Sequence, residues 1–233
     1  MVVSKKVTWR KALLTFFAPI FVVFFVRWAL FEPYVIPSGS MIPTFLIHDH
    51  ILVNKWAYGF RWPFTERWLT FWKKPSVGEI VVFRYPRDMK TFFVKRVVAV
   101  AGDSIAVREG VLLRNGQIVD RTPIAFESSP PEALGEFDYY RETLGEYQFV
   151  SRSHRYMPRS SAETMVVPEG HFFVVGDNRD ESLDSRAWGF VPEVNLIGRA
   201  GVIWLSCENT LPAAPFICDP KTMRWSRLFK TAH

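Results

Sequence analysis

The sequence has few cysteines and no metal-binding or nucleic-acid signature, and these absences limit its possible functions. Its 233 residues include two cysteines, Cys207 and Cys218, and no histidine is spaced from them as a structural zinc site requires. Heptads, internal repeats and aromatic RNA-binding motifs are also missing, so we expect no nucleic-acid partner despite a formal net charge of +6. In an oxidising compartment the two cysteines are expected to form a disulfide, although two free thiols remain the alternative.

The N-terminal segment lacks acidic residues. Residues 1–11 carry four cations and no acid, and an uncharged run of 15 residues follows from Ala12 to Val26. With Arg27 included, the apolar segment reaches 20 residues at Phe31. At ~1.5 Å per residue this length spans roughly 30 Å, the thickness of the hydrocarbon core of a bilayer. We therefore expect one transmembrane helix within residues 1–31, with the positive N-terminus in the cytoplasm.

A cleaved signal peptide is the alternative to a permanent anchor. No small-x-small cleavage site follows the apolar run, because Trp28, Phe31, Glu32 and Pro33 occupy that place. The sequence therefore favours an uncleaved signal-anchor, which places residues 32–233 outside the membrane.

Most of the remaining chain is predicted to be antiparallel β-structure. Short apolar runs rich in Val, Ile and Phe alternate with turn dipeptides such as Glu109-Gly110 and Asn115-Gly116. The expected strands cover residues 51–53, 80–83, 92–100, 105–107, 111–113, 118–119, 171–175 and 196–205. We therefore expect a mainly β fold, an antiparallel sheet or barrel-like domain that follows the single helix.

Two stretches interrupt this pattern. Residues 127–146 hold six acids and one arginine, and we expect an inserted surface lobe at about 120–165, mostly solvated and partly disordered, with no chemistry in its charges. Residues 56–74 are aromatic and basic, which fits either a surface that enters the lipid headgroup region or an aromatic corner of the core. The basic, aromatic tail at residues 223–230 is a second candidate lipid contact.

The turn from Pro37 to Thr44 contains a candidate nucleophile, Ser40. Two prolines and Gly39 favour a tight turn that presents the Ser40 hydroxyl beside backbone N–H groups, although most Ser-Gly-Ser turns are plain loops. Such a hydroxyl needs a base. His48 and His50 lie too close in sequence to fold back onto it easily, whereas Lys95 lies in an apolar run where burial favours the neutral amine. Because most strand lysines face water, the residues alone leave the base open.

Four segments together resemble the bacterial type I signal peptidases, or leader peptidases, a family of Ser/Lys serine proteases. They occur in the order of the family and extend from the anchor to the C-terminal region. The segments are residues 37–44, residues 78–86, residues 93–103 and residues 176–191, the last of which includes Gly176-Asp177-Asn178-Arg179-Asp180.

The resemblance implies a role for each residue of the site. Ser40 would be the acylating nucleophile and Lys95 the general base, with Ser182 orienting the Lys95 amine. The Ser40 N–H and the Ser38 hydroxyl would stabilise the oxyanion. Four charged side chains would support the site through ion pairs: Arg96, Asp177, Asp184 and Arg186. Shallow apolar pockets for the substrate would be lined by Tyr34, Ile36, Pro37, Met41, Val82, Phe93 and Val94. The substrate backbone would add as a strand beside residues 92–95.

The implied function is removal of signal peptides at Ala-x-Ala sites from secreted preproteins. The catalytic domain would lie at the outer face of the bacterial cytoplasmic membrane, held there by the helix and by an aromatic and basic surface on the lipid. The secretion translocon is a further candidate partner, and no metal or organic cofactor is expected. A specialised pilin- or conjugation-type peptidase and an idle preprotein-binding homologue are the alternatives. A LexA-like self-cleaving protein is opposed by the anchor.

Three residues depart from the usual family pattern. Glu79 replaces a more usual Asp, Ala101 replaces a frequent Pro, and Glu181 stands where Asn is common. We expect the Glu181 charge to raise the pKa of Lys95 and to shift the activity optimum to more alkaline pH.

Overall fold

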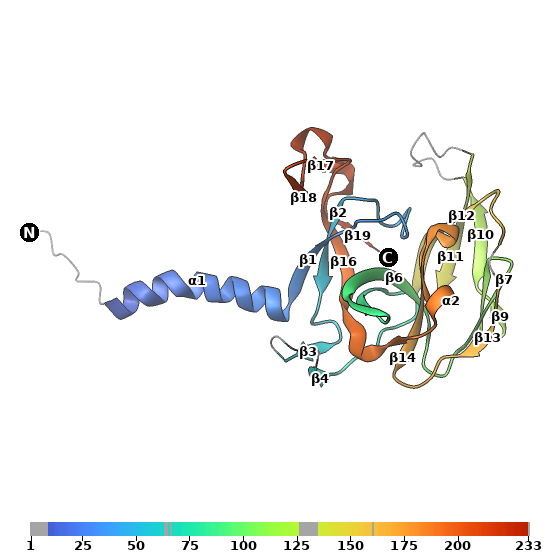
Figure 1. The fold of residues 1–233 in the computed structure, drawn as a ribbon, viewed down its shortest axis with the longest axis horizontal. Helices are drawn as coiled ribbons and strands as arrows, with labels where there is room; N and C mark the ends of the chain where they lie inside the picture. The colour runs from blue at the N-terminus through green and yellow to red at the C-terminus, as the bar shows by residue number, and fades with distance from the viewer. Residues whose placement is uncertain (1–8, 63–64, 66, 126–134, 160, 233) are drawn as a thin grey trace, which may run out of the picture.

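The N-terminal helix stands apart from the rest of the molecule. The computed structural model describes residues 9–62, 65, 67–125, 135–159 and 161–232. Helix α1 (Trp9–Ala29) has 21 residues and projects away from a body made almost wholly of strands (Figure 1). Its mean hydropathy of 2.0 and its length are sufficient to cross a membrane, and Ala29 is its one buried residue. The single apolar helix expected at the N-terminus is therefore present.

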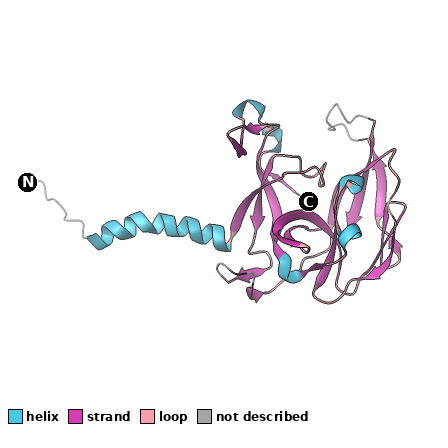
Figure 2. Ribbon diagram, viewed as in Figure 1, coloured by secondary structure: helices cyan, strands magenta, loops and turns pink. Residues whose placement is uncertain are grey.

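One long antiparallel sheet organises the body (Figure 2). Its order is not the order of the sequence, because strand β16 lies between β2 and β5. The strands, in spatial order, are β1 (Phe31–Val35), β2 (Asp49–Asn54), β16 (Leu196–Ser206), β5 (Ile80–Tyr85), β6 (Asp88–Val100), β14 (His171–Val175) and β15 (Val191–Pro192), and β19 (Lys230–Thr231) pairs with β16. The prediction of a mainly antiparallel β fold is confirmed.

Smaller sheets cover one end of the long sheet and form two projections. Three apolar clusters fill the body, and one of them joins β6 and β14 to the smaller sheets through Val98, Ile105, Phe149 and Phe173. The smaller sheets contain β13 (Ala162–Val166), β7 (Ser104–Arg108), β8 (Val111–Arg114) and β9 (Gln117–Ile118); β10 (Asp120–Ile124), β11 (Phe137–Leu144) and β12 (Tyr147–His154); β3 (Gly59–Arg61) and β4 (Trp68–Phe71); and β17 (Thr210–Leu211) and β18 (Ala214–Cys218). The short helix α2 spans Ser185–Trp188.

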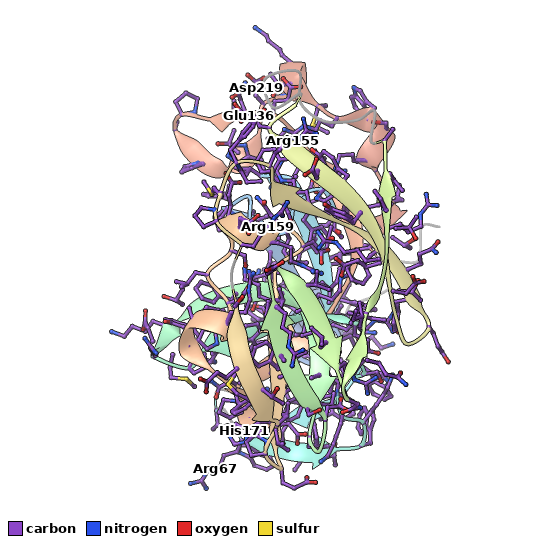
Figure 3. The ribbon with its side chains drawn as sticks, turned by 90° about the vertical axis from the view of Figure 1, so that its right-hand side faces the viewer. Arg67, Glu136, Arg155, Arg159, His171 and Asp219 are labelled. Atoms are coloured by element: carbon purple, nitrogen blue, oxygen red, sulfur yellow. A yellow bond between two sulfur atoms is a disulfide. The ribbon has the colours of Figure 1, made fainter. Side chains whose placement is uncertain are left out.

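The acidic stretch differs from its prediction as a solvated lobe. Residues 126–134 lie outside the described residues, but the stretch from 137 onward forms the β11–β12 hairpin. Alternate side chains of this hairpin face inward, and Glu142 is only 1% exposed because it is paired with Arg179 at 2.5 Å and with Arg121 at 3.7 Å. On the outer side, Arg155 pairs with Asp138 at 2.8 Å near one end of the molecule (Figure 3). The expectation of a solvated stretch was therefore wrong for Glu142, whose buried carboxylate requires cationic partners. The expectation that these charges carry no chemistry stays a prediction.

The aromatic stretch is divided between the core and the surface, and its expected contact with lipid headgroups stays a prediction. Tyr58 is fully buried and donates to Glu79 at 2.8 Å, so part of the stretch is core. Trp56, Trp62 and Trp72 remain about half exposed, at 48%, 55% and 48%. The stretch therefore anchors the β3–β4 hairpin from within and presents indole rings to the surroundings.

The expected disulfide is confirmed. Cys207 and Cys218 are joined, and their bond closes the small hairpin of β17 and β18. Two histidines at the start of β2 contact the segment closed by this bond. The ring of His48, just before the strand, lies 2.8 Å from the carbonyl oxygen of Glu208, and the ring of His50, within it, lies 2.9 Å from that of Phe216. The C-terminal segment is thereby attached to the strand that follows the Ser40 turn.

Candidate active site

The turn that carries Ser40 is anchored by buried side chains on either side of it. Met41 and Phe45 are 1% and 0% exposed, and they insert into the apolar cluster beneath β2 and β16. Two backbone bonds close the turn, from Ile42 N to the Gly39 oxygen at 3.1 Å and from Phe45 N to the Met41 oxygen at 3.0 Å. Ser40 is therefore held on a rigid turn at the edge of the core.

The loop after β14 supports this turn from the other side. The backbone N–H of Asn178 donates to the carbonyl oxygen of Ser40 at 3.1 Å, and its side-chain amide donates to the carbonyl oxygen of Gly39 at 2.9 Å. A Cβ atom at position 176 would overlap Ser182 Oγ and the carbonyl oxygen of Ser40. Only glycine lets the two segments approach this closely, which explains the Gly-Asp-Asn sequence at this point.

Lys95 reaches Ser40 from strand β6. Its Nζ atom donates to Ser40 Oγ at 2.5 Å, although the two residues are 55 positions apart in the sequence. The lysine is 3% exposed. Burial lowers the pKa of Lys95 from 10.5 to about 8; the carboxylates of Asp184 and Asp177 oppose this shift, and Arg186 adds to it. The amine is thereby brought within reach of its neutral form near physiological pH.

Arg96, the next residue, points to the opposite face of the strand and is fully buried. Its guanidinium binds both oxygens of Asp177, at 2.8 Å and 2.7 Å, donates to the Gly78 oxygen at 2.7 Å, and stacks on the Phe149 ring. Thr44 donates to the same carboxylate at 2.5 Å. Asp177 therefore links β6, the loop after β14 and the end of the Ser40 turn.

A second buried carboxylate, Asp184, organises the rest of the loop. It accepts from the Gly176 N–H at 2.9 Å and pairs with Arg186 through two bonds of 2.8 Å each. Arg186 in turn donates to the carbonyl oxygen of Arg179. The structure thus brings together the four charged residues that the sequence selected as supports, in two buried carboxylate–guanidinium pairs.

The bond expected between Ser182 and Lys95 is not formed. Ser182 Oγ lies buried against Gly176, and it has no hydrogen-bond partner among the described residues. The Lys95 amine instead makes its 2.5 Å contact with Ser40 Oγ. The orienting role of Ser182 therefore stays a prediction, supported by its position beside the dyad rather than by a bond.

A cleft of about 460 Å³ runs along these groups. Of the residues predicted to line substrate pockets, five border it and two do not: Val82 is fully buried beneath it, and Tyr34 lies beyond it, with its ring 5.7 Å from that of Phe92. The lining comprises Ile36, Pro37, Ser38, Gly39, Ser40, Met41, Thr91, Phe92, Phe93, Val94, Lys95, Glu181 and Leu183. Leu183 also lines the cleft but was not predicted from the sequence. It is a large apolar residue within a polar loop, which could have indicated it, and it is 57% exposed.

One edge of β6 is open beside this cleft. Strand β5 pairs with residues 92–96 and with Asp88, but the pairing of β14 on the other side begins only at Arg96. Within the described part of the chain no strand covers that edge of residues 91–95. An extended peptide can therefore add to the sheet there through its backbone.

The histidines contact other parts of the molecule. His50 lies between the oxygens of His48 and Phe216, and the His171 ring contacts the Glu169 oxygen at the end of the molecule opposite Asp219 (Figure 3). No described histidine forms a hydrogen bond with Ser40, and the described residues contain no cluster of His, Cys, Asp and Glu suited to a metal ion. Lys95 is the titratable group in contact with the candidate nucleophile.

Glu181 is engaged elsewhere. Its carboxylate accepts from Arg152 at 3.1 Å and from the Asn178 amide at 2.7 Å. Because Arg152 compensates this charge, the carboxylates that raise the pKa of Lys95 are those of Asp184 and Asp177. The predicted effect of Glu181 on Lys95 is not what the structure shows.

A serine hydroxyl in contact with a buried lysine amine, beside an open strand edge, is the arrangement of a peptide-cleaving hydrolase. The comparisons with known proteins agree with this class. The model of the family described as "Signal peptidase, peptidase S26" matches residues 9–205. The chain belongs to this family, the bacterial type I signal peptidases, and is a serine peptidase.

Two relatives that are similar in sequence give the same result. The signal peptidase I of Pseudomonas aeruginosa is 38% identical over 204 residues, which cover 82% of this chain and 71% of the relative. That of Rickettsia prowazekii is 32% identical and covers 89% of this chain and 88% of its own length. A solved signal peptidase I from Enterococcus faecalis V583 is 25% identical, covers 55% of this chain and 97% of that chain, and has a TM-score of 0.33.

Proposed function

We propose that the protein is a membrane-anchored endopeptidase that removes N-terminal signal peptides from exported preproteins, with Ser40 as nucleophile and Lys95 as general base. The observation that carries the proposal is the 2.5 Å contact between Lys95 Nζ and Ser40 Oγ in a buried site. Membership of the signal peptidase family supports the substrate class.

The reaction follows from this contact. The neutral Lys95 amine accepts the proton of Ser40 Oγ while the oxygen attacks the carbonyl carbon of the scissile bond. The Ser40 N–H and the Ser38 hydroxyl stabilise the negative oxygen of the tetrahedral intermediate. The Lys95 ammonium then protonates the leaving amine, and a water molecule deprotonated by the same amine hydrolyses the acyl ester on Ser40.

The lowered pKa of Lys95 gives this mechanism its efficiency. With a pKa of about 8, about one amine in ten is neutral at pH 7. An unperturbed lysine would be neutral roughly two orders of magnitude less often. Burial therefore raises the fraction of Lys95 that is neutral, and able to act as a base, above that of an exposed lysine.

The cleft accounts for the expected Ala-x-Ala preference. The substrate adds as a strand to the open edge of β6 at residues 92–95, which directs alternate side chains toward the floor of the cleft. Ile36, Met41 and Val94 line shallow apolar depressions there, which admit methyl groups and exclude larger side chains. Tyr34, at the far side of Phe92, contacts the residue between the two alanines.

The anchor places the site near a membrane. In our proposal α1 crosses the bacterial cytoplasmic membrane once, the four cations of residues 1–11 stay in the cytoplasm, and residues 32–233 lie outside as the catalytic domain, with residues 120–165 as its inserted lobe. Strand β1 starts two residues after α1 ends. The half-exposed Trp56, Trp62 and Trp72 contact the lipid headgroups, and preproteins arrive from the secretion translocon.

Cleavage of a preprotein with an Ala-x-Ala site tests the proposal. We expect the detergent-solubilised protein to cut it, and both Ser40→Ala and Lys95→Ala to lose roughly 10³-fold or more in kcat. Lys90→Ala is the matched control, because Lys90 lies exposed on the same strand and should keep its rate. Activity retained by Lys95→Ala would assign the base to another group. An inactive wild type would favour a specialised pilin-type peptidase or an idle preprotein-binding homologue.

A further inference from the structure

A second, larger cavity lies outside the active site. Its volume is about 730 Å³, and it shares no lining residue with the cleft at Ser40. Its lining is mostly apolar and consists of Arg27, Pro33, Tyr34, Val35, His50, Trp204, Leu205, Phe216, Ile217, Cys218, Pro220, Met223 and Trp225. Tyr34, which lines it, is also the proposed contact of the substrate residue between the two alanines; the other lining residues have no part in the reaction proposed at Ser40.

The two ends of the chain build its walls. One wall comes from the last turn of α1 and from β1, and the other comes from the end of β16, the disulfide hairpin and the segment through Trp225. The family match stops at residue 205, so the hairpin wall lies beyond the part of the chain that the family model covers. The Cys207–Cys218 bond and the contact between His50 and the Phe216 oxygen hold this wall in place.

The cavity lies beside the C-terminal end of α1, so a ligand would reach it from the membrane. Arg27 belongs to the helix that, in our proposal, spans the membrane, and it lies two residues before the last residue of that helix, Ala29. The hairpin of β17 and β18 lies on the side of the body from which α1 emerges (Figure 1). The mouth of the cavity therefore lies at the level of the lipid headgroups, where Phe216 and Trp225 are 66% and 69% exposed.

The described lining of the cavity has one arginine, Arg27, and no carboxylate. The Arg27 side chain is 62% exposed, and its contact with Glu32 is long, at 3.8 Å. Glu32 lies closer to Lys55, at 3.3 Å, so one carboxylate lies between two cations. A guanidinium with donors to spare binds a phosphate well.

We propose that this cavity binds one membrane glycerophospholipid, with an acyl chain between β1 and the disulfide hairpin and its phosphate at Arg27. The inference rests on the proposed membrane orientation, but not on the peptidase mechanism. Apolar walls around Trp204, Phe216 and Trp225 suit a hydrocarbon chain, and a cation at the rim suits an anionic headgroup. Such a lipid would fix the hairpin against the end of α1. The apolar part of a signal peptide is the competing occupant.

Photo-crosslinking in nanodiscs tests the proposal. The full-length Ser40→Ala protein is placed in phosphatidylcholine nanodiscs that contain phosphatidylglycerol with a diazirine on its acyl chain, and crosslinked peptides are identified by mass spectrometry. We expect crosslinks to concentrate in residues 204–225. Because Ser40→Ala is used throughout, the result does not depend on whether the peptidase mechanism is correct.

Matched variants distinguish a bound lipid from the general lipid annulus. Trp225→Ser should reduce crosslinking at residues 204–225 about tenfold, because it removes a large apolar wall. Trp62→Ser removes a similarly exposed tryptophan from the β3–β4 hairpin and should change crosslinking at residues 204–225 less than about twofold. Phe216→Ser provides a second wall variant should Trp225→Ser fold poorly. Equal effects of Trp225→Ser and Trp62→Ser, or crosslinks spread evenly over Trp56, Trp62 and residues 204–225, would overturn the proposal.

Headgroup and competition experiments complete the test. Arg27→Gln should lower crosslinking several-fold for the phosphatidylglycerol probe and for a phosphatidylcholine probe, because both carry the phosphate diester. It should leave unchanged a diacylglycerol probe with the same acyl chain, which has no phosphate. Equal loss for the diacylglycerol probe would exclude a phosphate contact at Arg27. Displacement of the probe by a synthetic signal peptide at a concentration that fills the active-site cleft would assign the cavity to the preprotein instead.

Discussion

Strand β6 has two halves whose environments differ sharply. Residues 88–94 are exposed or half-buried, with an edge open to the cleft, whereas residues 96–99 are buried between β5 and β14. Two adjacent cations, Lys95 and Arg96, mark the boundary, and both are at most 3% exposed. The chain thus buries two neighbouring positive charges on opposite faces of one strand.

The two cations are accommodated in different ways. Arg96 cannot lose its proton, so it is paired with Asp177 through two short bonds. Lys95 contacts Ser40 rather than a carboxylate, and burial lowers its pKa to about 8. A buried charge is therefore either compensated by a partner, which gives stability, or left partly uncompensated, which in our proposal gives a general base.

Removal of the Lys95 amine alone should have the largest effect on activity and tests the difference between the two cations most directly. We expect Lys95→Met to lose roughly 10³-fold or more in kcat on a preprotein, because the general base is gone while the length of the side chain is kept. The thermal unfolding midpoint should not fall, since the variant removes a buried titratable group. A large drop in that midpoint would show that Lys95 is also structural.

The same substitution one residue later should act on stability. Arg96→Met leaves Asp177 buried without its cation, and we expect a loss of about 3–5 kcal/mol in the free energy of unfolding. Chemical denaturation of the detergent-solubilised protein measures it. The double variant Arg96→Met with Asp177→Asn should recover part of the loss because no uncompensated charge remains. If the losses of unfolding free energy from the two single substitutions simply added in the double variant, Arg96 and Asp177 would not stabilise the fold as a pair.

The pH dependence of kcat/KM sharpens the assignment of Lys95. Since the neutral amine is the active form and its pKa is about 8, activity should rise about tenfold per pH unit below pH 8 and level off above it. The unperturbed lysine value of 10.5 would instead give a rise that continues to about pH 10. A rate that is flat between pH 6 and pH 9 would exclude Lys95 as the base.

Substitution of Ser182 tests whether its hydroxyl positions the Lys95 amine. We expect Ser182→Ala to lower kcat about tenfold, the value of one hydrogen bond that forms when substrate is bound. KM should change little, because Ser182 does not line the cleft. Ser182→Thr, which keeps the hydroxyl, is the matched comparison. An unchanged kcat in Ser182→Ala would reduce Ser182 to a packing residue.

The smallest effect is expected at Glu181. Because Arg152 compensates its carboxylate, Glu181→Gln should change kcat/KM less than about twofold and leave the pH profile in place. Asp184→Asn offers the contrast, since the Asp184 carboxylate raises the pKa of Lys95 and its loss should move the profile to lower pH. A profile that shifts with Glu181→Gln would restore the effect first expected from the sequence.

The elements with local signals could be predicted from the sequence. The apolar run before Glu32 indicated α1, and turn dipeptides such as Asn115-Gly116 indicated the β hairpins, where both residues have positive φ. The role of the Ser40 turn depended on family resemblance, because a Ser-Gly-Ser turn has no strong local signal. Lys95 was ambiguous for the same reason: periodicity could not decide which of two adjacent cations faced the cleft.

The sequence by itself determined the apolar N-terminal helix, the β-strands, the close pair of cysteines and the order of the four family segments, since each depends on residues near one another in the chain. Only the tertiary structure decided that Lys95 meets Ser40, that both adjacent cations are buried, that Glu142 is a buried partner of Arg179, and that the hairpin at Cys218 lies beside the end of α1. These contacts follow from the sheet order, in which β16 separates β2 from β5, and no local periodicity encodes that order.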